Sequence, residues 1–185
     1  MKDIAKNVLI HASKGDMKAF EMIYEATSGF VYNIALRITN NPEDAGDVTQ
    51  DVFMKIYRNL GQFRRQSSFK TWVYRITVNT AINTWRERAR EADRRDDDSS
   101  LIDQYASRAE PAIDKHDHEK LIISLLELLN PDQRACIVLR EIEGLNYKEI
   151  SEALKININT VRSRLKRARE TLLAFKGREV MKHEM

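Results

Sequence analysis

Residues 147–169 read YKEISEALKININTVRSRLKRAR, and this stretch decides the fold of the C-terminal part of the chain. Residues 147–154 and the residues from 158 to about 175 each follow a helical period, and residues 155–157 form a short turn between them. Asn157 can cap the second helix, because asparagine is favoured at that position. Two short helices joined by a tight turn, the second one basic, predict a helix-turn-helix, although Lys155 stands where many such turns have glycine.

The second helix of this motif has an apolar side and a cationic side. At about 100° per residue, one side carries Val161, Leu165, Ala168 and Leu172. The outward side and its flanks carry Thr160, Arg162, Ser163, Lys166 and Arg167. A merely solvated face is the alternative, but it would normally intersperse acids for i, i+4 pairing, and residues 159–169 contain none. Because arginine and lysine bind phosphates and arginine also contacts guanine, we predict that this side binds DNA.

The remaining sequence is also helical in pattern, with no alternating strand runs and no internal repeat. The 185 residues include only 6 glycines and 3 prolines, which favours helices over turns. We predict an all-α fold of two small helical domains, residues 1–90 and residues 116–178. The polar, acidic residues 91–115 are expected to form a flexible linker, and residues 179–185 a tail.

The composition excludes several classes of protein. Apolar residues make up 42% and charged residues 32%, which is typical of an ordered globular chain, and no apolar run approaches the ~20 residues of a membrane span. A single cysteine, Cys136, excludes a disulfide framework and a cysteine-rich zinc module, and its apolar helix predicts a core position. We therefore expect a cytoplasmic protein without membrane insertion. The net charge of +3 arises from two basic blocks that flank the acidic linker.

A narrow polar stripe runs along a helix expected over residues 69–90. It carries, at steps of three or four residues, Arg75, Asn79, Asn83, Arg86 and Arg90, with Trp72 at its head. Two interpretations are open: the amides are satisfied in the core or at a cap, or the stripe binds unpaired bases. In the second case amides bond base edges, aromatic rings stack on bases and arginines hold phosphates. The preceding loop would then close over a base with Arg64, Arg65, Gln66 and Ser67.

No pattern of catalytic residues is present in the sequence. It has no glycine-rich phosphate loop and no nucleophile elbow. His116 and His118 point apart on a helix, so they make a poor metal pair. We expect neither enzymatic activity nor a cofactor or metal. A stand-alone helix-turn-helix regulator is the alternative function, and an enzyme of unknown type is a third, weaker one.

Several motifs in order resemble the extracytoplasmic-function sigma factors of bacterial RNA polymerase. In the N-terminal part they are Gly15-Asp16, Ala19-Phe20, DVTQDVF at 47–53, Phe63-Arg64 and FKTWVYRITVN at 69–79. In the C-terminal part they are LRE at 139–141, GLNYKEI at 144–150 and NTVRSR at 159–164. The resemblance spans nearly the whole chain, and it implies a transcription initiation factor that binds core RNA polymerase and promoter DNA.

The resemblance also implies roles for individual residues. A docking surface on the polymerase would be formed by Asp47, Gln50, Asp51 and Phe53. Asn79 matches the position that takes a flipped base of the −10 element, and residues 64–68 match the loop that forms its pocket. The −35 element would be bound by Arg162, Ser163, Lys166 and Arg167, with Arg140 near its phosphates. The acidic linker would pass through the polymerase. Anti-sigma factors are common in the family, so we expect one as a further partner.

Overall fold

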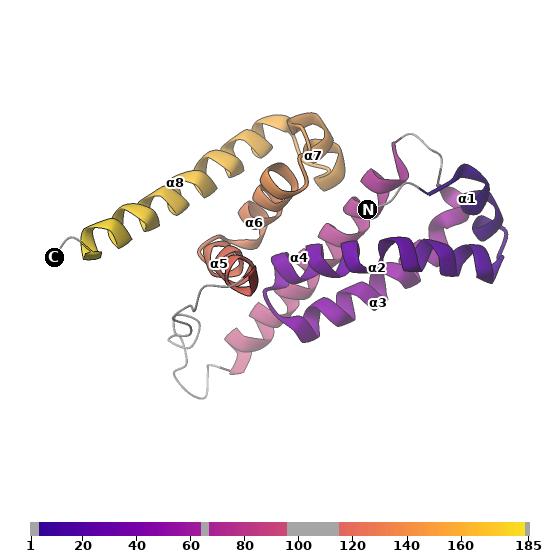
Figure 1. Cartoon of the computed structure of the whole chain (residues 1–185), viewed down its shortest axis with the longest axis horizontal. Coiled ribbons are helices and arrows are strands. Elements are labelled where there is room, and N and C mark those ends of the chain that lie inside the picture. Colours follow the sequence, from indigo (N-terminus) through magenta and orange to yellow (C-terminus); the bar gives the residue numbers. More distant parts are fainter. Residues whose placement is uncertain (1–3, 64–66, 96–114, 184–185) are drawn as a thin grey trace.

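The computed structural model describes residues 4–63, 67–95 and 115–183, and within these ranges every regular element is a helix (Figure 1). The N-terminal domain contains α1 (Lys6–Ser13), α2 (Met17–Thr39), α3 (Pro42–Asn59), the 3₁₀ turn η1 (Leu60–Gln62) and α4 (Phe69–Arg95). The C-terminal domain contains α5 (Lys115–Glu127), α6 (Pro131–Ile137), the π-helical turn η2 (Val138–Ile142), α7 (Tyr147–Leu154) and α8 (Ile158–His183). The predicted all-α fold is confirmed. In the described part of the chain, no helix is long and apolar enough to cross a bilayer.

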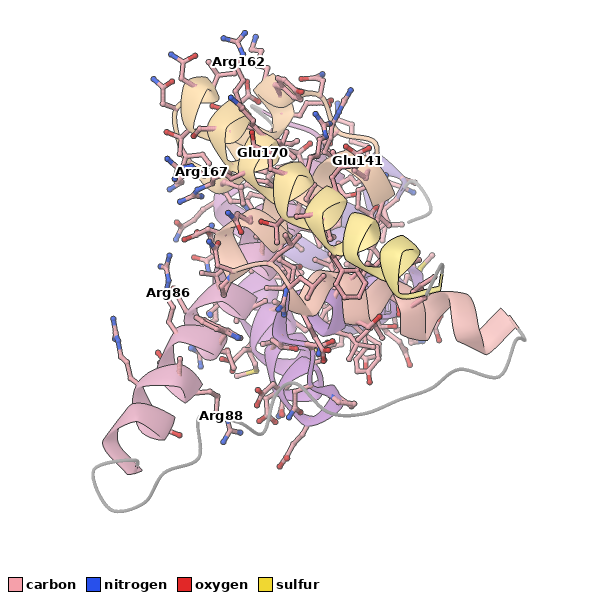
Figure 2. All side chains as sticks on the ribbon, turned by 90° about the vertical axis from the view of Figure 1, so that its left-hand side faces the viewer. Arg86, Arg88, Glu141, Arg162, Arg167 and Glu170 are labelled. Atoms are coloured by element: carbon pink, nitrogen blue, oxygen red, sulfur yellow. The ribbon has the colours of Figure 1, made fainter. Side chains whose placement is uncertain are left out.

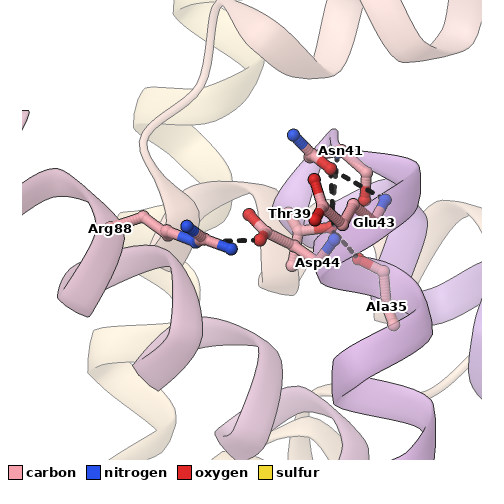
Figure 3. A network of polar contacts seen from close by, with 6 residues as sticks. All are labelled: Ala35, Thr39, Asn41, Glu43, Asp44 and Arg88. Atoms are coloured by element: carbon pink, nitrogen blue, oxygen red, sulfur yellow. Dashed lines mark hydrogen bonds and ion pairs between the residues drawn. The ribbon is translucent and has the colours of Figure 1, made fainter.

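Local capping fixes where α2 and α3 begin and end. Asp16 caps α2 by accepting hydrogen bonds from two backbone amides, and Asn40 ends that helix in the left-handed conformation. Asn41 then caps α3, since its Oδ1 accepts from the backbone N–H groups of Glu43 at 2.8 Å and Asp44 at 3.1 Å (Figure 3). Pro42 occupies the first turn, where a missing N–H is tolerated.

The N-terminal core forms where α2, α3 and α4 pack together. Val48, Val52 and Ile56 form an apolar stripe at steps of four residues along α3, and Leu60 of η1 continues it. This stripe packs against buried side chains of α2 and α4, which include Ile23, Val31, Ile34, Ile38, Val73 and Val78. Arg88 of α4 is joined to Asp44 of α3 by an ion pair of 3.0 Å (Figure 3). The sequence indicates a second apolar side on α4, and the structure covers α4 with α6 and α7 of the other domain.

The C-terminal domain contains the predicted helix-turn-helix, formed by α7 and α8. Val161, Leu165 and Ala168 are buried, as their spacing predicts, and Asn157 caps α8 by accepting from the N–H of Asn159 at 2.8 Å. Lys155 takes the left-handed conformation, with φ at 53°, that the turn demands. The helix-turn-helix is therefore confirmed, with a lysine at the position that glycine would fill without strain.

Four segments differ from the sequence-based expectation. The helix α2 runs unbroken through Thr27, Ser28 and Gly29, residue types that often bend or interrupt a helix. The helices α4 and α8 continue to Arg95 and His183, beyond the expected ends at residues 90 and 175, because strong helix formers such as arginine, glutamate and alanine follow. The π-helical turn η2 was not expected. The predicted linker lies mostly outside the described residues, so its flexibility stays a prediction.

The two domains pack against each other. In Figure 1, α5, α6 and α7 lie along α2 and α4, and the contacts between helices agree with this view. The buried apolar side chains of both domains form one continuous cluster. We call the contact of α2 and α4 with α5, α6, η2 and α7 the seam.

Candidate nucleic-acid interface

A groove of about 390 Å³ lies between α3 and α4, and it gathers most of the predicted polar stripe. We call it the α4 groove; its lining is Lys55, Asn59, Gln62, Trp72, Arg75, Ile76, Asn79, Thr80 and Asn83. None of the described residues that line it is acidic. A ligand of this groove would meet two cations and several amides, a set that fits the phosphates and base edges of a nucleic acid.

The amides of Asn79 and Asn83 are free to bind a ligand. Asn79 is half-buried and Asn83 is exposed, and neither side chain hydrogen-bonds any described residue. The alternative that these amides are satisfied in the core or at a cap is therefore not supported. An unpaired, partly desolvated amide gains a hydrogen bond when a base edge approaches it, which favours binding of unstacked bases.

Trp72, expected to stack on a base, is largely buried in the structure, and its contact with DNA stays a prediction. Its side chain is only 7% exposed, and its ring packs on Phe63 and Phe69 with centroid distances of 5.1 and 5.8 Å. Little of the ring is left for stacking on a base, so Trp72 mainly forms the wall of the groove. Of the loop predicted to close over a base, Ser67 is half-buried, whereas Arg64, Arg65 and Gln66 lie outside the described residues.

Three residues on the far wall of the groove were missed by the sequence analysis. Lys55, Asn59 and Gln62 follow one another at steps of four and three residues, so they share one side of α3 and η1. Their spacing could have predicted a shared polar surface. The sequence analysis did not consider it, because the apolar stripe on the same helix indicates core packing. Lys55 Nζ donates to Thr80 Oγ1 at 3.0 Å and so places a positive charge beside α4.

The outward face of α8 carries the predicted DNA-binding side chains. Arg162, Ser163, Lys166 and Arg167 are exposed, and Thr160 is half-buried. In Figure 2, Arg162 and Arg167 of α8 and Arg86 of α4 project from the same side of the molecule. Ser163 Oγ donates to the Thr160 carbonyl at 3.0 Å. We call Thr160, Arg162, Ser163, Lys166 and Arg167 the α8 face. These side chains suit contacts to phosphates and to bases in the major groove.

Acids from other elements partly neutralise α8, although the helix has none of its own between residues 159 and 169. Glu141 of η2 pairs with Arg169 at 2.7 Å, and Asp132 of α6 pairs with Arg164 at 3.3 Å. Glu170, just beyond that stretch, lies 3.8 Å from Lys166. Spacing within one helix could not reveal the first two pairs, because they depend on tertiary packing.

Two predicted DNA-binding arginines already have partners within the protein. Arg86 lies outside the α4 groove, with Nη2 at 3.1 Å from Asp132 Oδ2 across the seam. Arg140 is half-buried; its Nη1 donates to the Leu145 carbonyl at 2.9 Å, and its guanidinium lies 5.3 Å from the centre of the Tyr147 ring. Arg140 thus supports the turn that leads into α7, and its phosphate contact stays a prediction.

The predicted polymerase-docking residues divide into two groups. Asp47, Gln50 and Asp51 are exposed on α3. Phe53 is only 6% exposed and packs on Tyr24 with ring centroids 4.6 Å apart, so it supports the helix from within instead of offering a free surface. Its burial follows from its contact with Tyr24 of α2, and a direct contact of Phe53 with the polymerase stays a prediction.

The described residues form neither a metal-binding cluster nor a reactive cysteine site. No three side chains of the metal-binding types cluster there. Cys136 is fully buried, as expected, and burial raises the pKa of its thiol to about 11, which keeps it protonated and unreactive at neutral pH. What remains is a molecule with a groove of cations and amides and a separate cationic helix face, both suited to a polyanion.

Comparison with known families agrees with this arrangement. The family model for Sigma-70 region 2 matches residues 23–91, which include the α4 groove, and the model for Sigma-70 region 4 matches residues 119–172, which include the helix-turn-helix. A stand-alone regulator would need only the second match, so the presence of both favours a sigma factor.

Relatives of known function match over most of their length. The chain is 34% identical to the RNA polymerase sigma-H factor of Pseudomonas aeruginosa over 167 residues, 86% of each chain. It is 33% identical to the ECF RNA polymerase sigma-E factor of Escherichia coli over 180 residues, 92% of this chain and 94% of that one.

A solved structure has the same fold. It is a sigma factor RpoE bound to the anti-sigma factor NepR from Bartonella quintana, and it matches with 27% identity and a TM-score of 0.64 over 84% of this chain and 94% of that one. Together with two matched regions and full-length relatives above 30% identity, this shows that the chain belongs to the extracytoplasmic-function sigma factors, the alternative sigma subunits that bind bacterial RNA polymerase and promoter DNA.

Proposed function

We propose that the α4 groove binds the unpaired −10 bases of the non-template strand. The observation that carries this proposal is the pair of free amides, Asn79 and Asn83, in a groove whose described lining contains no acid. Capturing an unstacked base offsets part of the free energy needed to open the duplex, so binding here promotes strand separation. Arg75 and Lys55 supply the charge that holds the backbone of the strand.

The proposal assigns the −35 element to the α8 face. Helix-turn-helix proteins place the N-terminal residues of the second helix against base edges in the major groove, and Thr160, Arg162 and Ser163 occupy that part of α8. Arg167 lies about one turn further on. Arginine contacts to guanine would specify the sequence, and lysine contacts to phosphates would set the position.

Docking on core RNA polymerase is assigned to the exposed polar side of α3, with Asp47, Gln50 and Asp51 as contacts. The chain itself would contribute no bond-making or bond-breaking step, and it would act in the cytoplasm, where the polymerase and the chromosome are. A charge-reversal variant, D47K/D51K, tests this docking by co-migration with core polymerase. The matched control is E21K/E25K, which reverses two exposed acids of α2.

An anti-sigma factor is proposed as a regulatory partner. The support is the structural relative from Bartonella quintana, which was solved with the anti-sigma factor NepR. The proposal is tested by affinity purification of the tagged chain from its own organism, followed by run-off transcription with and without each captured protein. A captured protein that blocks transcription and is displaced by excess core polymerase would support the proposal, and capture of polymerase subunits alone would contradict it.

The whole function is tested by run-off transcription with core polymerase on a randomised promoter library. The expected result is a set of transcripts whose templates share one upstream and one downstream element. No transcript above the level of core polymerase alone would contradict the proposal, and so would a shared upstream element without a downstream one.

A further inference from the structure

Asn159 and Arg162 contact each other in the first turns of α8. Asn159 is the second residue of this helix, and the cap fixes its backbone, because its N–H donates to Asn157 Oδ1 at 2.8 Å. Its side-chain Oδ1 accepts a hydrogen bond from Arg162 Nη1 at 3.0 Å. Residues three positions apart share one side of a helix, so the contact needs no distortion of α8. Both side chains are exposed, and Arg162 projects outward from the molecule (Figure 2), so DNA can reach it.

This contact differs from those of the neighbouring cations of α8. Arg164, Lys166 and Arg169 lie 3.3, 3.8 and 2.7 Å from a carboxylate oxygen. Arg162 forms no ion pair with a described residue, and its partner is the neutral amide oxygen of Asn159. A carboxylate compensates the charge of the cation that it holds, whereas an amide does not. Arg162 is therefore held in place and still able to displace a counterion from DNA.

The contact also determines which part of the Arg162 guanidinium is available. Arginine carries five N–H donors in one plane. Asn159 takes a donor of Nη1, whereas Nε and Nη2, which together form one edge of the fork, donate to no described residue. Two parallel N–H groups on one edge match the O6 and N7 acceptors that guanine presents in the major groove. The arrangement thus leaves a bidentate edge free on a side chain that is already held.

Holding this edge in advance favours guanine over the other bases. A mobile arginine loses rotamer freedom when a bidentate contact fixes it, which lowers affinity by about 2- to 10-fold for one such side chain. Asn159 removes part of that freedom before DNA binds. Bases that do not fix the side chain gain nothing from this, so the contact with Asn159 increases the preference for guanine and not the affinity for all DNA.

We propose that Asn159 is a positioning residue that holds Arg162 for a bidentate contact with one guanine of the −35 element. This inference rests on the proposed function, because it concerns how the α8 face selects its DNA. Asn159 acts through Arg162 and makes no base contact of its own. Removing the Asn159 amide should therefore change the base preference at the position that Arg162 contacts, and at no other position.

The first test asks whether Asn159 and Arg162 affect the same base pair. Holoenzymes that contain the wild-type, R162A or N159A chain bind a library of promoters with a randomised upstream element and a fixed downstream element, and the bound templates are sequenced. A bidentate arginine contact discriminates by about 5- to 150-fold, so the wild type should prefer guanine by this factor at one position. R162A should lose that preference, and N159A should lower it by about 2- to 10-fold at the same position.

A double-variant cycle separates positioning from direct base contact. If Asn159 acts only through Arg162, its removal has no further effect once Arg162 is absent. The variant N159A/R162A should then show the same base preferences as R162A. A residue that contacts a base itself would change a preference in both backgrounds.

Two further variants identify the chemical group that matters. N159D keeps an oxygen acceptor at the same place, so it should retain the preference for guanine, while its negative charge weakens binding to every template. S163A is the matched control on the same face. The hydroxyl of Ser163 donates to the Thr160 carbonyl and not to Arg162, so S163A should retain the guanine preference at the Arg162 position.

The proposal is overturned if N159A keeps the full preference for guanine, weakens binding to all templates equally, or changes a position that R162A does not affect. It is also overturned if R162A loses no guanine preference, or if N159D loses the preference together with N159A. Selection by the wild-type holoenzyme separates this failure from failure of the proposed function. A selected upstream element that is independent of Asn159 removes only the positioning role, whereas the absence of any selected upstream element contradicts the proposed function.

Discussion

The two candidate DNA-binding surfaces of this sigma factor are prepared for their ligands in different ways. The α4 groove has free amides at Asn79 and Asn83, and no acid is found among its lining residues in the part of the chain that the structure describes. Around α8, by contrast, Arg164, Lys166 and Arg169 each already lie beside a carboxylate. The groove needs no rearrangement of ion pairs to accept a base, whereas Lys166 of the α8 face, and Arg164 and Arg169 beside it, must exchange carboxylates for phosphates before they can bind DNA.

This difference fits the two kinds of DNA. Unpaired bases present hydrogen-bonding edges that a fixed set of amides can match, so a preformed groove limits the entropy lost on binding. A duplex presents mainly phosphates, and cations bind these in competition with other anions. The comparison makes the α4 groove a hydrogen-bonding surface and the α8 face an electrostatic one, and the following changes can separate the two.

The largest effect is expected from Trp72→Ala, which tests whether the groove is a packed structure. Removing a buried tryptophan from the ring cluster with Phe63 and Phe69 should lower the free energy of unfolding by about 3–5 kcal/mol. Chemical denaturation followed by circular dichroism measures this change, and Trp72→Phe should lose less. Near-normal stability combined with lost promoter opening would show instead that the ring stacks on a base.

The next effect is that of Asn79→Ala on promoter opening. Losing the amide removes hydrogen bonds to a captured base, which is expected to weaken open-complex formation by about 1–3 kcal/mol, or roughly 5- to 150-fold. Permanganate footprinting and run-off transcription measure the loss, while co-migration with core polymerase should be unchanged. Asn33→Ala, at an exposed position on α2, is the matched control. Loss of core binding in Asn79→Ala alone would make Asn79 a structural residue.

A smaller effect, but one that distinguishes the two surfaces, is expected in the salt dependence of promoter binding. Arg162→Ala removes a cation of the α8 face, so the slope of log K against log salt concentration should become shallower by about 0.9 for one lost phosphate contact. Asn79→Ala should weaken binding at an unchanged slope, because an amide releases no counterion. Lys14→Ala, in the turn between α1 and α2, is the control for loss of a cation. Equal slopes for Arg162→Ala and Asn79→Ala would contradict the view that the α8 face binds DNA mainly by charge and the α4 groove mainly by hydrogen bonds.

The sequence was sufficient to predict most of the helices and most of the α4 residues that line the α4 groove. Helical spacing placed Asn79 and Asn83 on one side of α4, and this local property does not depend on the rest of the fold. Spacing also placed Val161, Leu165 and Ala168 in the core. What it could not give were contacts between distant segments, such as the joint binding of Arg86 and Arg164 by Asp132. Phe53 shows the same limit, because its burial depends on Tyr24 in another helix.

The turn of the helix-turn-helix gives the smallest expected effect and the only stabilising one. Lys155 is held in the left-handed conformation, which is strained for a residue with a Cβ atom and is normally taken by glycine after a helix. Lys155→Gly should therefore raise the free energy of unfolding by about 0.5–1 kcal/mol, even though glycine also gains freedom in the unfolded chain. Lys148→Gly, at an exposed position inside α7, should lower it by about 1 kcal/mol. Thermal denaturation of both variants measures the difference, and two changes of the same sign would mean that the turn is not strained. If the strain is present, the α8 face should bind DNA equally well in Lys155→Gly, because the turn fixes the angle of α8 with either residue.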